Sequence, residues 1–267
     1  MSKRTNKEEA IGVFDSGLGG LTVVKQLLKQ LPTEDIIYFG DTARVPYGTK
    51  SKESIIRFSI ENTKILLDHN VKVIVVACNS SSAYALSALQ NIFRIPIIGV
   101  IEPGVQEAIA KSKNKRIGVI ATSATVNSHA YKKAIEQKDS SVVIYEKACP
   151  LFVPVIEEGW AKKDIAQSIA KEYLSTLLKR DIDTLVLGCT HYPLLKSTLK
   201  KVACDITLID SAQAVAKLVK IVLCEEGLQT SSKKEGYKTF LVSDRPQNFQ
   251  RIAKGLLGQE LKNIKEV

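Results

Sequence analysis

The sequence of 267 residues has few cysteines and no pair of them with metal-binding spacing. Its five cysteines are unevenly placed and form no C-x-x-C motif, which argues against a disulfide scaffold and a structural zinc site. The longest apolar runs fall far short of the roughly 20 residues that cross a bilayer. The N-terminal segment MSKRTNKEEA also lacks the apolar core of a signal peptide. We therefore expect a cytoplasmic protein with free thiols, no bound metal and no membrane partner.

Glycine and proline are also scarce, with 15 and 8 residues, whereas apolar residues make up 45% and charged residues 25%. This composition is typical of a globular protein, and at roughly 150 residues per domain the length predicts about two domains. The net charge is +10, but the lysines are spread along the chain and no aromatic-rich basic stripe is present. We expect solvated lysines that attract an anionic substrate, and no specific nucleic-acid partner.

Short β-rich apolar runs alternate with segments of helical spacing. The runs lie at 11–14, 36–39, 73–77, 97–101, 117–120, 142–145, 184–187 and 206–209. Uninterrupted runs of this kind suit strands that are buried on both faces of a parallel sheet. Helical spacing occurs in 51–69, 162–179 and 211–224, and the second of these places Ile165, Ile169, Tyr173 and Leu177 on one stripe. The alternation predicts an α/β fold with mostly parallel sheets flanked by helices.

The chain also contains an internal repeat. Three pairs of segments match in the same order: IGVFDS at 11–16 with IGVIAT at 117–122, IIYF at 36–39 with VVIY at 142–145, and VIVVACNS at 73–80 with TLVLGCTH at 184–191. Any single match is weak, because buried parallel strands resemble one another, but three in order indicate two similar units.

The repeat predicts two α/β domains related by pseudo-symmetry. We expect the first to comprise residues 1–100 and 213–267, and the second to comprise residues 101–212. The boundary would lie near a turn at 102–104, and the last segment is too short for a third domain.

Two cysteines occupy equivalent positions in the repeat. Cys78 and Cys189 each follow a buried strand and precede small polar residues that are typical of helix starts. The free N–H groups and partial positive charge of a helix start would favour a thiolate and lower the cysteine pKa. Because ligands of open α/β sheets bind at the carboxyl ends of strands, two domains that face each other would aim both thiols into one cleft. We expect Cys149, Cys204 and Cys224 to be structural.

Two opposed thiols suit inversion of a stereocentre next to a carboxylate. One group must remove a proton from one face while the other returns a proton to the opposite face. One sulfur would therefore be a thiolate and the other a thiol, and the two would exchange roles at each turnover. No motif for an electron-sink cofactor is evident in the sequence.

Each cysteine has a different proton-handling neighbour. Asp15 begins the loop DSGLGG, which is neither a dinucleotide fingerprint nor a P-loop. The repeat counterpart of Asp15 is Ala121, and that of His191 is Ser80, so neither Asp15 nor His191 is required by the fold of the unit. Asp15 could instead be a turn-forming residue, but the asymmetry favours a functional role. It pairs Asp15 with Cys78 and His191 with Cys189.

Two further segments read as ordinary surface on the residues alone. Tyr47 and Gly48 lie in a stretch rich in turn formers, which is typical of a surface loop. Glu157 lies in a Glu-Glu-Gly-Trp segment, which is typical of a solvated helix end.

Together these motifs resemble the cofactor-independent aspartate/glutamate racemase family. The matching segments are FDSGLGG at 14–20, YFGDTARVPYG at 38–48, ACNS at 77–80, PLFVPVIEEG at 150–159 and GCTHYPLL at 188–195. They follow the family's order, and the DSGxGG start is typical of its glutamate branch. The family commonly has Thr and Ala after Cys-Asn, where this chain has Ser80 and Ser81; serine keeps the first hydroxyl for binding a carboxylate.

The resemblance implies an active site in the cleft between two domains and no cofactor. It implies that Cys78 acts on D-glutamate and Cys189 on L-glutamate, with Asp15 assisting the former, and with His191 and Glu157 assisting the latter. The positions that match the family's substrate contacts are Asp15, Ser16, Tyr47, Gly48, Asn79, Ser80, Thr190 and His191. It further implies a homodimer that supplies D-glutamate for peptidoglycan of the cell wall.

Three other functions stay open at the level of sequence. The chain could racemise aspartate or another amino acid. It could be a cysteine hydrolase that pairs one thiol with His191, although such an enzyme needs only one cysteine. It could also be a two-lobed protein that binds an anion without chemistry.

Overall fold

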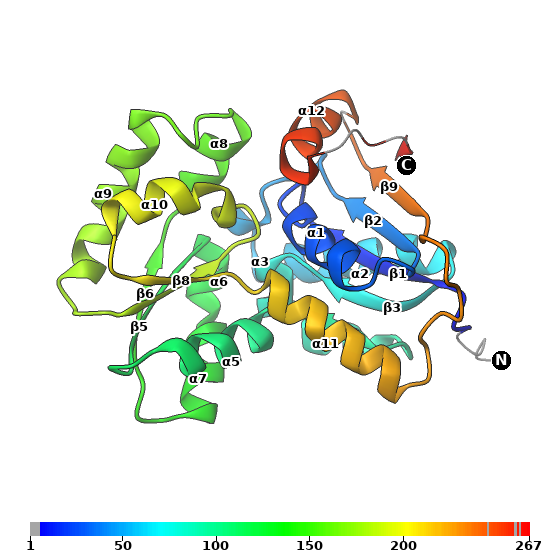
Figure 1. Ribbon diagram of the computed structural model, residues 1–267. Helices are drawn as coiled ribbons and strands as arrows, with labels where there is room; N and C mark the ends of the chain where they lie inside the picture. Colours follow the sequence, from blue (N-terminus) through cyan, green and yellow to red (C-terminus); the bar gives the residue numbers. More distant parts are fainter. Residues whose placement is uncertain (1–5, 245, 259–260, 262) are drawn as a thin grey trace.

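The computed structural model describes residues 6–244, 246–258, 261 and 263–267, and it shows two parallel β-sheets, each flanked by helices. The two sheets lie in two lobes side by side (Figure 1). The first sheet has the order β10-β9-β2-β1-β3-β4, and the second has the order β6-β5-β7-β8. The strands are β1 (Ala10–Asp15), β2 (Ile36–Gly40), β3 (Val71–Val76), β4 (Ile97–Gly99), β5 (Arg116–Ala121), β6 (Val143–Ala148), β7 (Thr184–Gly188), β8 (Thr207–Ile209), β9 (Lys238–Val242) and β10 (Ile264–Glu266).

The α/β class and the parallel sheets predicted from the apolar runs are confirmed. All eight runs form strands, β1 to β8, and every strand pairing is parallel. The sequence did not predict β9 or β10. β9 pairs with β2, which adds a segment from the C-terminal part of the chain to the edge of the first sheet.

Helices cover both faces of the sheets. They are α1 (Leu21–Gln30), α2 (Lys52–Asp68), α3 (Asn79–Tyr84), α4 (Leu86–Ile92), α5 (Ile101–Lys111), α6 (Ser123–Ser128), α7 (Ala130–Lys138), α8 (Phe152–Glu157), α9 (Asp164–Leu178), α10 (Lys196–Val202), α11 (Ala212–Glu225) and α12 (Pro246–Leu257), with short 3-10 turns η1 (Tyr47–Thr49) and η2 (Tyr192–Leu195). None of the described helices combines the length and apolar character that crossing a bilayer requires.

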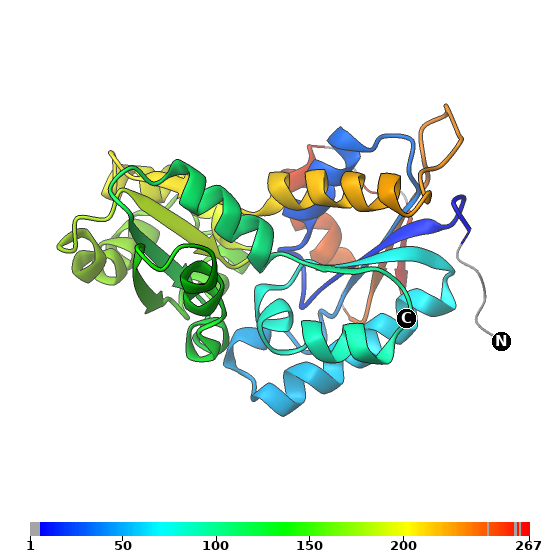
Figure 2. The same ribbon diagram turned by 90° about the horizontal axis from the view of Figure 1, so that it is seen from below.

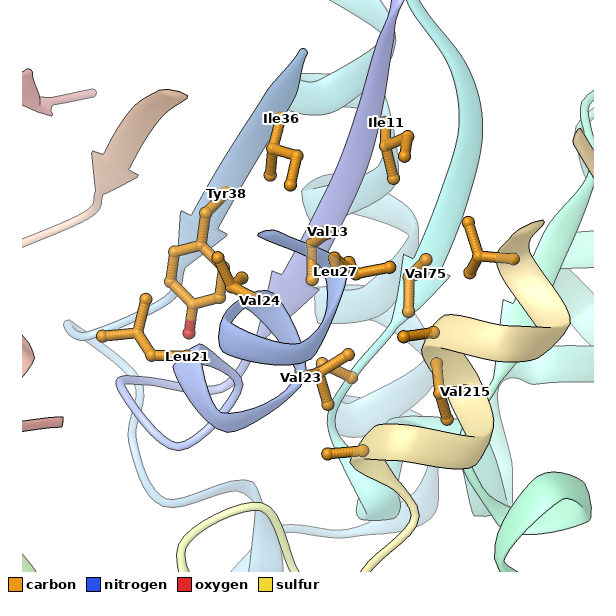
Figure 3. Packing of buried hydrophobic residues seen from close by; sticks show 14 of the residues in the cluster. Ile11, Val13, Leu21, Val23, Val24, Leu27, Ile36, Tyr38, Val75 and Val215 are labelled. Atoms are coloured by element: carbon orange, nitrogen blue, oxygen red, sulfur yellow. The ribbon is translucent and has the colours of Figure 1, made fainter. Parts of the chain in front are cut away.

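The largest hydrophobic cluster holds α1 and α11 against the first sheet. Val13 of β1 and Val75 of β3 contribute to it from the sheet, Leu27 from α1 and Val215 from α11, and all four are fully buried (Figure 3). Burial of one such side chain contributes about 1.5–3 kcal/mol to folding. Tyr38 of β2 belongs to the same cluster, and its hydroxyl donates a hydrogen bond of 2.7 Å to the carbonyl of Gly17. The core of the first sheet therefore also anchors the loop that follows β1.

Two helices connect the lobes. α5 leads from β4 of the first sheet to β5 of the second, and α11 leads from β8 back towards β9. The two helices pack against each other, as the view from below shows (Figure 2).

One local prediction was wrong and another only partly correct. The expected turn at 102–104 lies in the first turn of α5, where Pro103 is tolerated because the first N–H groups of a helix have no partner within it.

On α9, the predicted stripe is correct for Leu177, which is buried, and for Ile169 and Tyr173, which pack partly buried against the core. Ile165 is 45% exposed, and the buried face comprises Ala166, Ala170, Leu174 and Leu177.

Candidate active site

The carboxyl ends of both sheets border one narrow cavity. Cys78, which follows β3, and Cys189, which follows β7, both line it, and both are nearly buried. The other lining residues are Ser16, Pro46, Tyr47, Gly48, Asn79, Ser80, Thr122, Val153, Thr190 and His191. The structure thus brings the two repeat cysteines, from different sheets, to the same cavity.

Asp15 joins the two lobes but is not among the residues that line this cavity. Its Oδ2 accepts a hydrogen bond from the N–H of Gly17 at 3.1 Å, and its Oδ1 accepts one from the Thr190 hydroxyl at 3.1 Å. The carboxyl group is fully buried, and burial raises its pKa although the charge of His191 opposes the shift. Asp15 therefore holds its own loop and also the residue after Cys189.

The predicted lowering of the Cys78 pKa is wrong for this structure. Burial and the nearby Asp15 carboxylate raise the pKa of the Cys78 thiol to about 12. Cys78 does cap α3, and the N–H and hydroxyl of Ser81 partly offset the increase. The groups at the start of α3 therefore do not outweigh the cost of a buried negative charge beside Asp15.

His191 lies between Cys189 and Glu157. Its Nδ1 is 4.0 Å from the Sγ of Cys189, and its Nε2 is 3.1 Å from Oε1 of Glu157. Burial alone would lower the pKa of His191, but its interactions with Cys189 and Glu157 raise it to about 10. The two partners therefore favour the protonated imidazole. Glu157 ends α8 with its side chain 27% exposed, so the helix-end interpretation is correct but incomplete.

The helix expected directly after Cys189 does not begin there. The 3-10 turn η2 starts at Tyr192, and α10 starts at Lys196. The irregular turn still places the imidazole of His191 beside the sulfur of Cys189. A regular helix that starts at Thr190 is therefore not required for this contact.

Replacing Glu157 by glutamine should reduce the contribution that protonation of His191 makes to the free energy of unfolding. The raised pKa of His191 stabilises the fold fully below its ordinary value of 6.5, and this stabilisation is lost as pH rises through about 10. We expect Glu157→Gln to lower the unfolding free energy most below pH 6.5 and least above pH 10, as measured by urea unfolding across this range. Glu158→Gln, at an exposed neighbouring position, is the control. If the loss of unfolding free energy in Glu157→Gln grew towards pH 10, the interaction of Glu157 with protonated His191 would be contradicted.

A cluster of hydroxyl groups lies where the two lobes meet. The Ser80 hydroxyl is 2.9 Å from that of Thr122 and 3.3 Å from that of Thr125. Sequence reasoning proposed Ser80 but missed Thr122, which follows β5 and lines the cavity. The signal was present, because Thr122 is the repeat counterpart of Ser16.

Tyr47 is buried, and so it does not belong to a surface loop. Its hydroxyl donates to the carboxylate of Asp41 and accepts a hydrogen bond of 3.0 Å from the amide of Asn62. Neither partner lines the cavity, so the phenol is engaged on the side away from it. The adjacent Gly48 approaches the second lobe so closely that a Cβ there would lie 2.5 Å from the Cβ of Thr122.

Gly19 makes the closest approach of the first loop to the second lobe. A Cβ at this position would lie 2.4 Å from both His191 Nδ1 and the Thr190 hydroxyl.

We expect Gly19→Ala to lower kcat/KM by about 10²-fold, because the added methyl group must displace residues that border the cavity. Steady-state kinetics would measure the loss. Gly255→Ala is the matched control: nothing lies within 4 Å of its added Cβ, and alanine favours helix α12. Wild-type activity in Gly19→Ala would show that the contact can relax at no cost.

The side chains that line the cavity offer two thiols, one imidazole and several hydroxyl and amide groups. The carboxyl groups of Asp15 and Glu157 do not line it and act on it only through Thr190 and His191. Within the described residues, no group of three or more His, Cys, Asp or Glu side chains is arranged to hold a metal ion. The donors suit an anionic ligand, and the thiols suit proton transfer.

Comparison with known proteins agrees with this arrangement. A model of the Asp/Glu/Hydantoin racemase family matches residues 11–219. The glutamate racemase of Geobacter metallireducens is 48% identical over 260 residues, which cover 97% of this chain and 96% of that protein. Glutamate racemase isoform RacE1 from Bacillus anthracis superposes with a TM-score of 0.94 at 39% identity, covering 98% of each chain. Glutamate racemase from Francisella tularensis, solved in complex with D-glutamate, superposes with a TM-score of 0.92 at 43% identity, again covering 98% of each chain.

Proposed function

Because the chain belongs to the Asp/Glu/Hydantoin racemase family and is therefore an isomerase, we propose that it interconverts L- and D-glutamate without a cofactor. The observation that carries the proposal is that Cys78 and Cys189, from separate sheets, line one cavity. Relatives named glutamate racemases match the chain over almost its whole length, which supports glutamate as the substrate.

In the proposed reaction, Cys189 removes the α-proton of L-glutamate while Cys78 delivers a proton to the opposite face. The two roles reverse for D-glutamate. The raised pKa of Cys78 keeps this thiol protonated near neutral pH, which is the state that a proton donor requires. The charged imidazole of His191, 4.0 Å from Cys189, stabilises negative charge on that sulfur. One proton leaves the substrate and one returns, so the two thiols end in exchanged states.

The surrounding side chains have supporting roles in this proposal. Asp15 assists Cys78, and Glu157 assists Cys189 through His191. The residues that bind the substrate are Asp15, Ser16, Tyr47, Gly48, Asn79, Ser80, Thr190 and His191. Tyr47 contributes through its position and backbone, since Asp41 and Asn62 engage its hydroxyl. Hydrogen bonds to the substrate carboxylate stabilise the charge that develops when the α-proton leaves.

Further proposals concern the whole protein. We propose that residues 1–100 with 213–267 form one domain and residues 101–212 the other, which the membership of the two sheets supports. We also propose a cytoplasmic homodimer that supplies D-glutamate for peptidoglycan, in keeping with the implications of the family resemblance.

The decisive test is incubation of L-glutamate with the protein in D₂O. Loss of the α-proton signal in the NMR spectrum, with a parallel decay of circular dichroism, is the expected result. Decay with aspartate but not with glutamate would assign a different substrate. Binding of glutamate with no exchange by a folded, reduced protein would overturn the proposal in favour of a binding protein.

A further inference from the structure

Tyr131 touches residues adjacent to both cysteines, although neither the sequence motifs nor the proposed mechanism includes it. It lies on α7 of the second lobe and is fully buried. Its hydroxyl donates a hydrogen bond of 2.7 Å to Oδ1 of Asn79, the residue after Cys78 in the first lobe. This is a direct hydrogen bond between the lobes beside the cavity.

The ring of Tyr131 is held from two sides. A Cβ on Gly188, the residue before Cys189, would lie 3.1 Å from Cε2 of the ring. A Cβ on Gly104 of α5 would lie 3.8 Å from Cε1 and 3.7 Å from the hydroxyl oxygen. The ring also belongs to a hydrophobic cluster with Val105 of α5. The position of the hydroxyl is therefore set by the second lobe.

The state of the hydroxyl determines the orientation of the Asn79 amide. Burial raises the pKa of Tyr131, so the phenol keeps its proton at neutral pH. A buried hydroxyl needs an acceptor, and among the described residues its hydrogen-bond partner is Oδ1 of Asn79. The carbonyl end of the amide then points to Tyr131, and the NH₂ group points away from it. Asn79 lines the cavity, and its two side-chain N–H donors lie on the end of the amide that is not bound to Tyr131.

We propose that Tyr131 is a positioning residue that orients Asn79 so that its NH₂ group binds a carboxylate oxygen of the substrate. The inference rests on the proposed function, since it takes glutamate as the ligand. Without Tyr131 the amide can rotate and present its carbonyl oxygen, which repels a carboxylate. Because Tyr131 belongs to the second lobe and Asn79 to the first, this hydrogen bond couples substrate binding to the contact between the lobes.

The first test is Tyr131→Phe, which removes one oxygen atom and keeps the packing of the ring. We expect KM for both glutamate enantiomers to rise about tenfold, equivalent to about 1.4 kcal/mol, with kcat within about twofold of wild type. Tyr173→Phe is the matched control, because that hydroxyl contacts the Leu151 N–H in the same lobe, and its KM should be unchanged. A fall in kcat alone, with KM unchanged, would overturn the proposal.

A double-mutant cycle separates positioning from general structural support. The dissociation constant of racemic glutamate, measured by calorimetry, needs no turnover and is not altered by racemisation. Tyr131→Phe should weaken binding about tenfold in the wild type but less than twofold in an Asn79→Ala background. Equal losses in both backgrounds would overturn the proposal.

A spectroscopic signature provides a check that does not depend on ligand. The two side-chain N–H signals of Asn79 in ¹⁵N-labelled protein should be distinct in the wild type and broadened by exchange in Tyr131→Phe. Identical signals in both proteins would contradict the orientation argument. If wild-type protein does not racemise glutamate, the proposed function fails; if it does and the cycle shows no coupling, only the role of Tyr131 fails.

Discussion

Alanine at either Cys78 or Cys189 should lower the rate of glutamate racemisation by at least about 10³-fold. General acid–base groups typically contribute 10²- to 10⁴-fold, and a two-base inversion needs a group on each face of the α-carbon. Both sulfurs are nearly buried and both line the same cavity, so solvent is poorly placed to replace either of them. Circular dichroism of the reaction mixture measures the rate, and an unchanged melting temperature would show that the variants are folded.

The remaining cysteines provide the controls. Cys204 and Cys224 are exposed, and alanine at either position should leave racemisation within about twofold of wild type. A single remaining thiol can still remove and return a proton on its own face. In Cys78→Ala, exchange of the α-proton of L-glutamate without loss of optical activity would therefore support the two-base reaction. Full racemisation in either active-site variant would rule it out.

Glu34→Gln should lower the free energy of unfolding by about 3–5 kcal/mol. This is the largest loss of stability that we expect from a single substitution outside the candidate active site. Lys72 is fully buried, and its Nζ lies 2.5 Å from Oε2 of Glu34, whose side chain is 3% exposed. Glutamine keeps the shape and the acceptor that binds the Thr230 N–H at 2.9 Å. It removes the negative charge, so the buried Lys72 ammonium group keeps the Lys7 carbonyl as an acceptor but has no counter-charge. Urea unfolding would measure the difference.

The second half of this test removes both charges. Glu34→Gln combined with Lys72→Met should recover most of the lost stability, because a buried ion pair and a neutral pair of similar volume differ little in free energy. Glu136→Ala is the control, since its partner Lys132 lies 3.9 Å away and both side chains are 49% exposed; we expect a change below about 0.5 kcal/mol. Equal losses in the single and double variants would show that packing, not charge, holds this region.

The strands were predictable because a buried parallel strand has a signature in the sequence itself. Eight continuous apolar runs became β1 to β8. β9 and β10 were not predicted from the sequence. β10 is the edge strand, where burial on both faces is not required, and it has no fully buried residue. β9 lies between β10 and β2, but its first two residues are only partly buried, so its apolar run is short. Apolar spacing could not predict the whole buried face of α2 either, because that face includes the polar residues Ser59, Asn62 and Thr63. Asn62 is buried because it binds Tyr47, a partner that no helical periodicity can reveal.

The candidate site divides in a similar way. The repeat paired Cys78 with Cys189 and distinguished Asp15 and His191 from their counterparts, because duplication makes departures from symmetry visible in the sequence. Thr122 carried the same signal unnoticed. Tyr131 carried none, since its hydrogen bond to Asn79 joins residues from different lobes. The contact of Gly19 with His191 likewise depends on how the two lobes meet.

By itself, the sequence determined the strands β1 to β8, the repeat of two similar units, and the side chains that bring thiol, carboxyl and imidazole chemistry. Those properties depend on residue type and local order along the chain. Only the tertiary structure decided the proton affinities. It placed Cys78 beside Asp15 in a buried site and so raised the pKa of that thiol, the opposite of what a helix start predicts. It also placed His191 between Cys189 and Glu157. The physical reason is that a pKa is set by burial and by neighbouring charges, and both depend on segments that are distant in the sequence.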